Sequence, residues 1–188
     1  MLMRHPKVVD TLLKELSRTL PDGTNSESLN FDVISSNALP YTTAVFNETI
    51  RLYPPVPIEL KECTQESTFP DGTWLPKSAV VMWVPWSLGR SIRIWGDDAD
   101  LFRPERWLVT DEKGSISLLT KTAYEFPVFN GGPRSCLGKR MAELLAIYVI
   151  VSLISRYEFV DVDIKERRSQ NSLTLPMENG CPCRVQPR

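Results

Sequence analysis

The chain has 188 residues, of which 42% are hydrophobic and 24% are charged, a composition typical of a globular domain. The formal net charge is −1 and the isoelectric point is near 5.9, so no basic excess indicates binding to nucleic acid. The most apolar run, Leu144 to Ile154, has about half of the ~20 residues that a membrane-spanning helix requires. We therefore expect one domain with no nucleic-acid partner and no membrane span in this chain.

The chain contains four cysteines, Cys63, Cys136, Cys181 and Cys183. They do not form the dense framework of a small secreted protein, so we expect a reducing, intracellular compartment. Cys181 and Cys183 lack a second pair of cysteines or histidines, because His5 is the only histidine, and this argues against a zinc site. Cys63 has no polar cluster around it and is interpreted as an apolar filler.

Two helices are predicted in the first third of the chain. Pro6 suits a first helical position, and apolar residues recur at helical spacing from Val8 to Leu20. A polar, turn-rich connection is predicted over Thr24–Ser36. A second helix is predicted over Leu39–Tyr53, because the Pro-Pro pair that follows cannot continue it.

Short strands are predicted further along. Thr68–Trp74 is typical of a hairpin that turns at Asp71-Gly72, and Ala79–Val84 is apolar enough for a buried strand in the same small sheet. Thr110–Tyr124 is interpreted as a surface excursion. Further strand candidates near the C-terminus are Phe159-Val160, Leu173–Leu175 and Arg184-Val185. The predicted fold class is mainly α with small β-sheets, an α+β fold.

A glycine-rich loop with one cysteine, Phe129–Gly138, directly precedes a long apolar helix predicted to reach Arg156 and to be largely buried. Unpaired N–H groups at a helix N-terminus favour a thiolate, which can bind a metal or attack an electrophile. Glycines can adopt positive φ, so the backbone of this loop can approach a flat cofactor closely. Arg134 offers a forked set of donors that matches a carboxylate.

Two other interpretations of Cys136 are open from the residues alone. It could be a structural cysteine after a turn, which is the usual role of a lone cysteine near glycines. It could also be a nucleophile, but a nucleophile needs a base close to the sulfur, and His5 is far away in sequence.

The loop Phe129-x-x-Gly132-x-Arg134-x-Cys136-x-Gly138 resembles the haem-binding signature of the cytochrome P450 haem-thiolate monooxygenases at every defined position. The resemblance implies that the Cys136 thiolate is the axial ligand of the iron in haem b. It implies that Arg134 pairs with a haem propionate, and that Phe129, Gly132 and Gly138 complete the cofactor-binding loop. No residue of this chain is assigned a catalytic role beyond cofactor binding.

The segment Glu48-Thr49-Ile50-Arg51 is similar to the Glu-x-x-Arg helix of the same family, and Phe102–Trp107 is similar to the segment that supplies a further arginine, here Arg106. A glutamate held by two arginines implies a buried ionic network that serves architecture rather than chemistry. Trp107 stands where the family more often has phenylalanine.

Other positions match or depart from the family. Val56, Pro57 and Ile58 match a segment that lines the substrate pocket, and Leu173–Pro176 resembles a turn that enters this pocket. Gly89 stands where many relatives have histidine, which removes a polar contact near the haem edge, and Ser78 stands where the family often has glycine.

The resemblance extends over residues 1–188 and implies the C-terminal, haem-binding part of a cytochrome P450, without the distal helix and the N-terminal part. The implied function is a monooxygenase that uses O2 and electrons from an NADPH-dependent flavoprotein reductase to hydroxylate a lipophilic substrate, with a fatty acid or an alkane as the suggested class. Lys139 and Arg140 are candidates for the reductase-docking surface. Full-length relatives usually lie on the cytosolic face of the endoplasmic reticulum. The alternative is a truncated, non-enzymatic product that does not bind haem productively.

Overall fold

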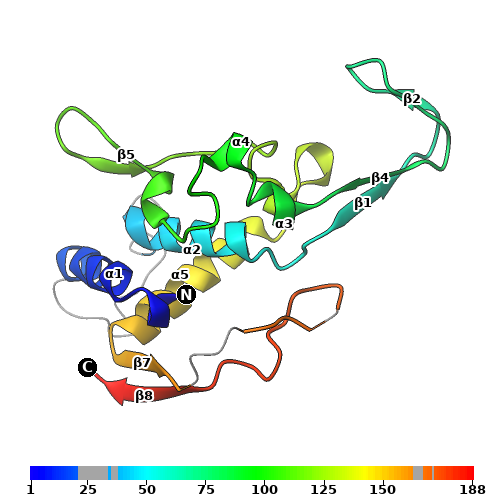
Figure 1. Ribbon diagram of the computed structural model, residues 1–188. Coiled ribbons are helices and arrows are strands. Elements are labelled where there is room, and N and C mark those ends of the chain that lie inside the picture. Colours follow the sequence, from blue (N-terminus) through cyan, green and yellow to red (C-terminus); the bar gives the residue numbers. More distant parts are fainter. Residues whose placement is uncertain (21–33, 35–37, 163–166, 171) are drawn as a thin grey trace.

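The structure is a computed structural model that describes residues 1–20, 34, 38–162, 167–170 and 172–188. Three helices form its centre, namely α1 (Pro6–Thr19), α2 (Pro40–Leu52) and α5 (Lys139–Ile154). They pack against one another in all three pairings, with α2 and α5 crossing near the middle of Figure 1. The main hydrophobic core lies between these helices.

The first two predicted helices are confirmed. α1 begins at Pro6 and buries Val8, Leu12 and Leu16, which lie four residues apart on one face. α2 begins at Pro40 and ends at Leu52, one residue inside each predicted bound. The predicted connection Thr24–Ser36 lies outside the described residues, apart from the buried Ile34.

A carboxylate from α1 holds the start of α2. Glu15 Oε1 accepts a hydrogen bond of 2.6 Å from the Tyr41 amide, and Oε2 accepts one of 2.8 Å from the Thr42 amide. These amides belong to the first turn of a helix, where no intrahelical acceptor is available to them. Glu15 therefore acts as a cap from another helix and fixes α1 against α2.

The strands of the described residues form small antiparallel pairs, which agrees with the predicted fold class of helices and small sheets. The pairs are β1 (Glu59–Glu62) with β4 (Val80–Trp83), β2 (Ser67–Thr68) with β3 (Trp74–Leu75), β5 (Leu108–Thr110) with β6 (Ile116–Leu118), and β7 (Tyr157–Asp161) with β8 (Cys183–Pro187). Shorter helical turns connect the larger elements: η1 (Leu2–Arg4), α3 (Pro85–Leu88), α4 (Ile92–Trp95), η2 (Pro104–Trp107), η3 (Pro127–Phe129) and η4 (Gly132–Arg134).

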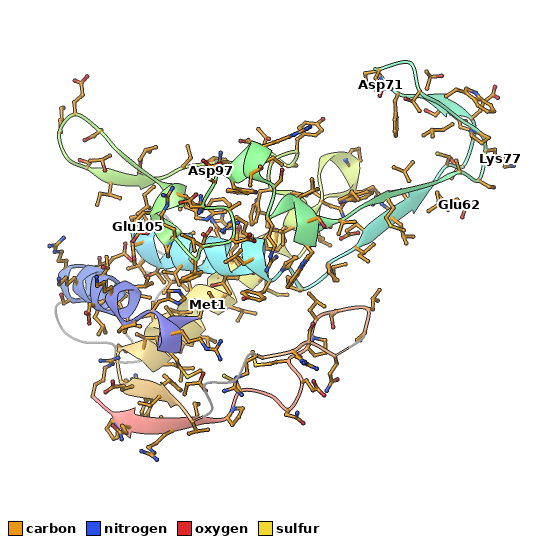
Figure 2. All side chains as sticks on the ribbon, in the orientation of Figure 1. Met1, Glu62, Asp71, Lys77, Asp97 and Glu105 are labelled. Atoms are coloured by element: carbon orange, nitrogen blue, oxygen red, sulfur yellow. The ribbon has the colours of Figure 1, made fainter. Side chains whose placement is uncertain are left out.

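The hairpin at Asp71-Gly72 is confirmed, but the prediction that it shares a sheet with the next strand is wrong. β2 and β3 pair only with each other, whereas β4 pairs with β1. Both ladders lie in an arm that projects from the helices, and Asp71, Lys77 and Glu62 mark its tip and its side (Figures 1 and 2).

The predicted burial of the Ala79–Val84 strand is also wrong. Val80 and Met82 in β4 are 60% and 58% exposed, because no described element covers that face of the arm. Ser78, which precedes β4, has φ 66°, so this turn uses the backbone conformation that glycine adopts most easily. The position is the one where the family often has glycine.

Near the C-terminus, β7 and β8 confirm the first and last strand candidates. Leu173–Leu175 forms no strand, contrary to the prediction, and a single bridge joins Ser169 to Met177 around it. The backbone of this segment instead bonds to a distant part of the chain, since the Leu175 amide donates a hydrogen bond of 3.0 Å to the Pro55 carbonyl.

α5 follows the predicted bounds closely, but the prediction that it is largely buried is wrong. Only Ile147, Val151 and Ile154 are buried, while Met141 and Leu145 are 65% and 57% exposed. The reason is that α1, α2 and β7 contact α5 on one side, while the side that carries Met141 and Leu145 is open to solvent. Among the described residues, no helix is both long and apolar enough to cross a bilayer.

Candidate functional site

Cys136 lies in the turn between η4 and α5, as the sequence predicted. Its amide donates a hydrogen bond of 2.8 Å to the Phe129 carbonyl, and its own carbonyl accepts one of 3.3 Å from the Lys139 amide. Lys139 is the first residue of α5, so the sulfur is carried next to the positive end of that helix. Cys136 is exposed, and its thiol is free.

The glycines of this loop serve different purposes. Gly132 has φ 62°, which a residue with a side chain rarely adopts, and Asn130 has φ 60°. Gly131 has φ −149° and Gly138 has φ −84°, so the expected positive φ occurs at only one of the three glycines. A Cβ atom added at Gly131 would lie 2.8 Å from the Cβ of Ala123, so this glycine is needed for close packing.

The side chains near the sulfur are mostly open to solvent. Arg134 is exposed and makes no ion pair with any described residue. Lys139 Nζ lies 5.6 Å from the centre of the Phe129 ring and 3.9 Å from a Glu143 carboxylate oxygen. The loop thus presents an exposed cysteine beside an exposed cation, with Phe129 half-buried behind them.

His5 is engaged at the start of α1. Its ring lies 4.8 Å from that of Phe102, and Nδ1 is 2.9 Å from the Met1 carbonyl oxygen. No contact between His5 and Cys136 occurs in the described part of the chain. The structure therefore does not assemble the cysteine–histidine pair that a nucleophilic mechanism requires.

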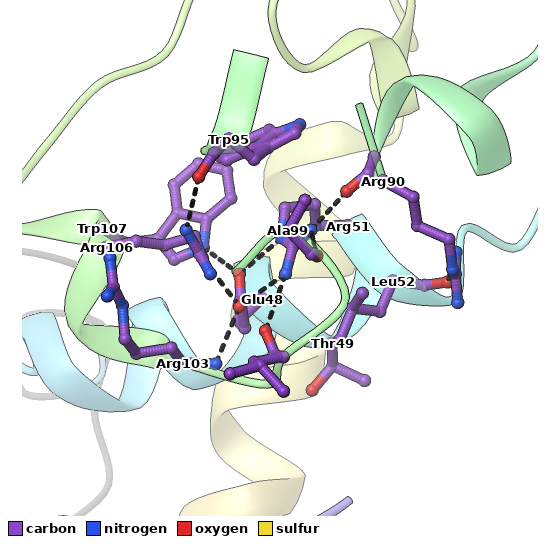
Figure 3. A network of polar contacts seen from close by, with 12 residues as sticks. Glu48, Thr49, Arg51, Leu52, Arg90, Trp95, Ala99, Arg103, Arg106 and Trp107 are labelled. Carbon is purple, nitrogen blue, oxygen red and sulfur yellow. Dashed lines mark hydrogen bonds and ion pairs between the residues drawn. The ribbon is translucent and has the colours of Figure 1, made fainter. Parts of the chain in front are cut away.

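The predicted ionic network is present around Glu48, which is fully buried (Figure 3). Arg51 Nε and Nη2 each donate a hydrogen bond of 2.7 Å to one of the two carboxylate oxygens. Arg106 Nε donates to Oε1 at 2.9 Å, and the Arg103 amide donates to the same oxygen at 2.8 Å. Trp107 Nε1 completes the set with a hydrogen bond of 2.9 Å to Oε2.

Arg51 is also saturated with partners. Nη1 donates to the Gly89 carbonyl and, at 2.6 Å, to the Ala99 carbonyl, and Nη2 donates to the Leu101 carbonyl at 3.1 Å. A Cβ atom at Gly89 would overlap the Arg51 carbonyl oxygen. Gly89 therefore lets the end of α3 lie directly on α2, so in this backbone a histidine could not replace it without a shift.

The donors around Glu48 determine its charge. Burial by itself raises the pKa of this carboxyl, but hydrogen bonds from Arg51, the Arg103 amide and Trp107 outweigh burial, and the pKa lies below its ordinary value. Glu48 is therefore ionised at neutral pH. A carboxylate that is charged and fully paired holds elements together and does not exchange protons with a substrate.

The structure brings together two of the segments that the family resemblance assigns to a substrate pocket. The hydrogen bond from the Leu175 amide to the Pro55 carbonyl places Leu173–Pro176 beside the residue that precedes Val56–Ile58. A cavity of about 540 Å³ lies elsewhere, between η1, α1, α2, α5 and the β7–β8 pair, and Val56, Pro57 and Ile58 do not line it.

Comparisons with known proteins show the family of the chain. The family model described as Cytochrome P450 matches residues 1–183. Cytochrome P450 94A2 of Vicia sativa is 35% identical over 190 residues, which is 100% of this chain and 36% of the relative. Cytochrome P450 704C1 of Pinus taeda is 36% identical, over 100% of this chain and 38% of the relative. Cytochrome P450 86B1 of Arabidopsis thaliana is 33% identical, over 96% of this chain and 33% of the relative.

The chain therefore belongs to the cytochrome P450 family. It spans about a third of the length of these curated relatives. Sequence reasoning missed two contributions to the scaffold, the Glu15 cap on α2 and the indole hydrogen bond to Glu48. Only the second had a signal, because Trp107 departs from the usual phenylalanine of the family.

Proposed function

We propose that this chain is the C-terminal, haem-binding part of a cytochrome P450 monooxygenase, with the Cys136 thiolate as axial ligand of haem b. The observation that carries the proposal is the placement of Cys136. It is exposed just ahead of α5, in a loop that is closed by the hydrogen bond from the Cys136 amide to the Phe129 carbonyl. This hydrogen bond, 2.8 Å from nitrogen to oxygen, fixes the backbone of the loop and leaves the sulfur open to a ligand.

The residues around the sulfur fit such a group. A thiolate is a donor that haem iron accepts, and Arg134 has no described carboxylate partner, so its guanidinium is available to a propionate. Phe129, Gly132 and Gly138 complete the cofactor-binding set, since a loop with little side-chain bulk can lie against a flat ring. When bound, the haem supplies the oxygen and redox chemistry, and the protein contributes the ligand, the anchoring of the propionate and the shape of the pocket.

The substrate and the electron donor are further parts of this proposal. The substrate is lipophilic, with a fatty acid or an alkane as the first class to test, and Val56, Pro57 and Ile58 form part of the pocket wall. O2 is the second substrate. Electrons come from an NADPH-dependent flavoprotein reductase that docks on the face carrying the exposed Lys139 and Arg140.

The test is the ferrous carbonyl spectrum of the purified chain after addition of haemin. We expect a red-shifted, thiolate-type Soret band that Cys136→Ser abolishes. Cys63→Ser is the matched control, because Cys63 is half-buried beside the β1–β4 pair and is not part of the loop. A thiolate-type band that survives Cys136→Ser, or that disappears with Cys63→Ser, contradicts the assignment.

A second candidate function is a non-enzymatic product that folds without holding haem. The observation in its favour is the exposed apolar side of α5, where Met141 and Leu145 are largely exposed, together with the exposed Leu137 just ahead of the helix. A soluble, folded chain that gives no thiolate-type band at any haemin concentration supports this candidate against the first. The same titration in a full-length relative with the same loop then shows whether haem binding needs the part of the relative that this chain does not span.

A further inference from the structure

Trp107 connects the ionic network to the segment that leads into the cysteine loop. It is buried, and its Nε1–H donates a hydrogen bond of 2.9 Å to Glu48 Oε2 (Figure 3). Its ring centre lies 4.7 Å from that of Phe126 in an edge-on contact. Trp95 supports both rings, at 5.3 Å from Trp107 and 6.4 Å from Phe126. One side chain thus contacts the buried charge with its polar edge and Phe126 with its ring.

Phe126 is joined directly to the loop. The next three residues form η3 (Pro127–Phe129), and the last of them supplies the carbonyl that accepts the Cys136 amide at 2.8 Å. A second contact lies beside this one, because Gly131 is close enough to Ala123 that a Cβ atom would come within 2.8 Å of the Ala123 Cβ. The turn before Phe126 therefore meets the loop at Ala123, and the loop is closed on itself between Phe129 and Cys136.

This turn is itself closed by polar contacts. The Phe126 amide donates to the Thr122 carbonyl at 2.9 Å, and Glu125 accepts from the Thr122 amide at 3.1 Å and its hydroxyl at 2.9 Å. Lys121 Nζ bonds to Glu125 at 2.9 Å and lies 5.5 Å from the centre of the Trp95 ring. Because these contacts close the turn, we expect residues 121–126 to move as a unit, so that a shift of Phe126 also shifts Ala123.

We propose that Trp107 is a positioning residue that couples the charged Glu48 carboxylate to the placement of Cys136, through Phe126 and η3. A phenylalanine at this position would retain the ring contact but could not donate to Glu48. The indole N–H orients the ring by a charge-assisted hydrogen bond, and the oriented ring fixes the edge of Phe126. The proposal does not depend on haem, because every contact in it belongs to the described chain.

The test is amide hydrogen exchange of the 188-residue chain, read by mass spectrometry on peptides covering 127–138. Trp107→Phe removes the N–H and keeps an aromatic ring. We expect exchange in 127–138 to become about tenfold faster, the size that loss of one hydrogen bond to a charged group produces, while peptides from α1 keep their rates. Trp74→Phe is the matched control, because Trp74 is exposed at the far end of the arm.

A role confined to local stability gives a different result. If Trp107→Phe speeds exchange only in α2 and η2 and leaves 127–138 unchanged, the coupling does not exist. Phe126→Leu keeps the test decisive where Trp107→Phe fails to fold, because it removes the edge contact and leaves the Glu48 hydrogen bonds in place. It should speed exchange in 127–138 and not in α2, and unchanged exchange in 127–138 overturns the proposal.

Discussion

Glu48 and Cys136 occupy opposite environments although a continuous set of contacts connects them. Glu48 is fully buried and accepts hydrogen bonds from two arginine side chains, one indole and one backbone amide. Cys136 is exposed, and its backbone is held by a bond to Phe129. A buried charge must be fully paired within the protein, whereas the Cys136 thiol is open to solvent and needs no such partner.

The comparison separates architecture from chemistry. The network around Glu48 fastens α2, α3, α4 and η2 to one another, and nothing in it is open to a substrate. The cysteine loop is mostly exposed, and its dependence on the network is the proposal made above. Substitutions in the two regions should therefore differ in size and in kind.

The largest effect is expected from Glu48→Gln. This change leaves Arg51 buried without its counter-charge and leaves Arg106 with Asp98 as its acidic partner, and removal of one partner from a buried ion pair costs about 3–5 kcal/mol. Urea unfolding followed by circular dichroism measures the loss. Glu66→Gln, at an exposed position, is the matched control and should change the free energy of unfolding by less than about 0.5 kcal/mol. Equal stability of the two variants would show that the network is not essential to the fold.

A smaller effect is expected on the pH dependence of stability. The pKa of Glu48 is lowered in the folded chain, mainly because hydrogen bonds from Arg51 and the Arg103 amide outweigh its burial. The stabilisation is therefore fully present above the ordinary glutamate pKa of about 4.3 and is lost as the pH falls through the lower native pKa. Urea midpoints measured on acidification should fall less steeply in Glu48→Gln than in the wild type. Parallel curves would contradict the assigned charge.

In the cysteine loop, Gly131→Ala should cost about 1 kcal/mol by overpacking. The backbone at Gly131 tolerates alanine, so the cost comes from the Cβ atom, which meets the Ala123 Cβ at 2.8 Å. Ala123→Gly in the same chain removes that atom and should restore the wild-type melting temperature. If Ala123→Gly does not rescue Gly131→Ala, the two segments are not in contact in solution.

The smallest effect is expected from the surface pair Lys121–Glu125, whose atoms are 2.9 Å apart. Hydrogen bonds from Lys121 and Thr122 lower the pKa of Glu125 to about 2, yet water and salt screen an ion pair at the surface, so we expect the pair to contribute little to the free energy of unfolding. A double-mutant cycle of Lys121→Met and Glu125→Gln measures the coupling. A coupling energy as large as that of the Glu48 pairs would show that a surface pair near the cysteine loop stabilises the fold as strongly as the buried network, contrary to expectation.

Local sequence determined the helices and part of the site. Proline at the start and apolar residues four apart were sufficient to place α1, because both signals act within one helix. Glu48 and Arg51 lie three residues apart on α2, so the spacing alone put them on one face. The cysteine loop was recognised from its fixed residues, and its position ahead of α5 is confirmed, while its role as haem ligand stays a prediction.

Tertiary structure decided which apolar surfaces are covered and which distant groups meet. The composition of α5 and β4 predicted burial, but a side chain is buried only where a neighbour packs on it, and one side of each element has none among the described residues. The Trp107 indole reaches Glu48 across 59 positions of sequence, and Glu15 reaches Tyr41 across 26. Neither contact follows from periodicity, because hydrogen bonds between separate elements depend on how the elements pack and not on the spacing of residues within one of them.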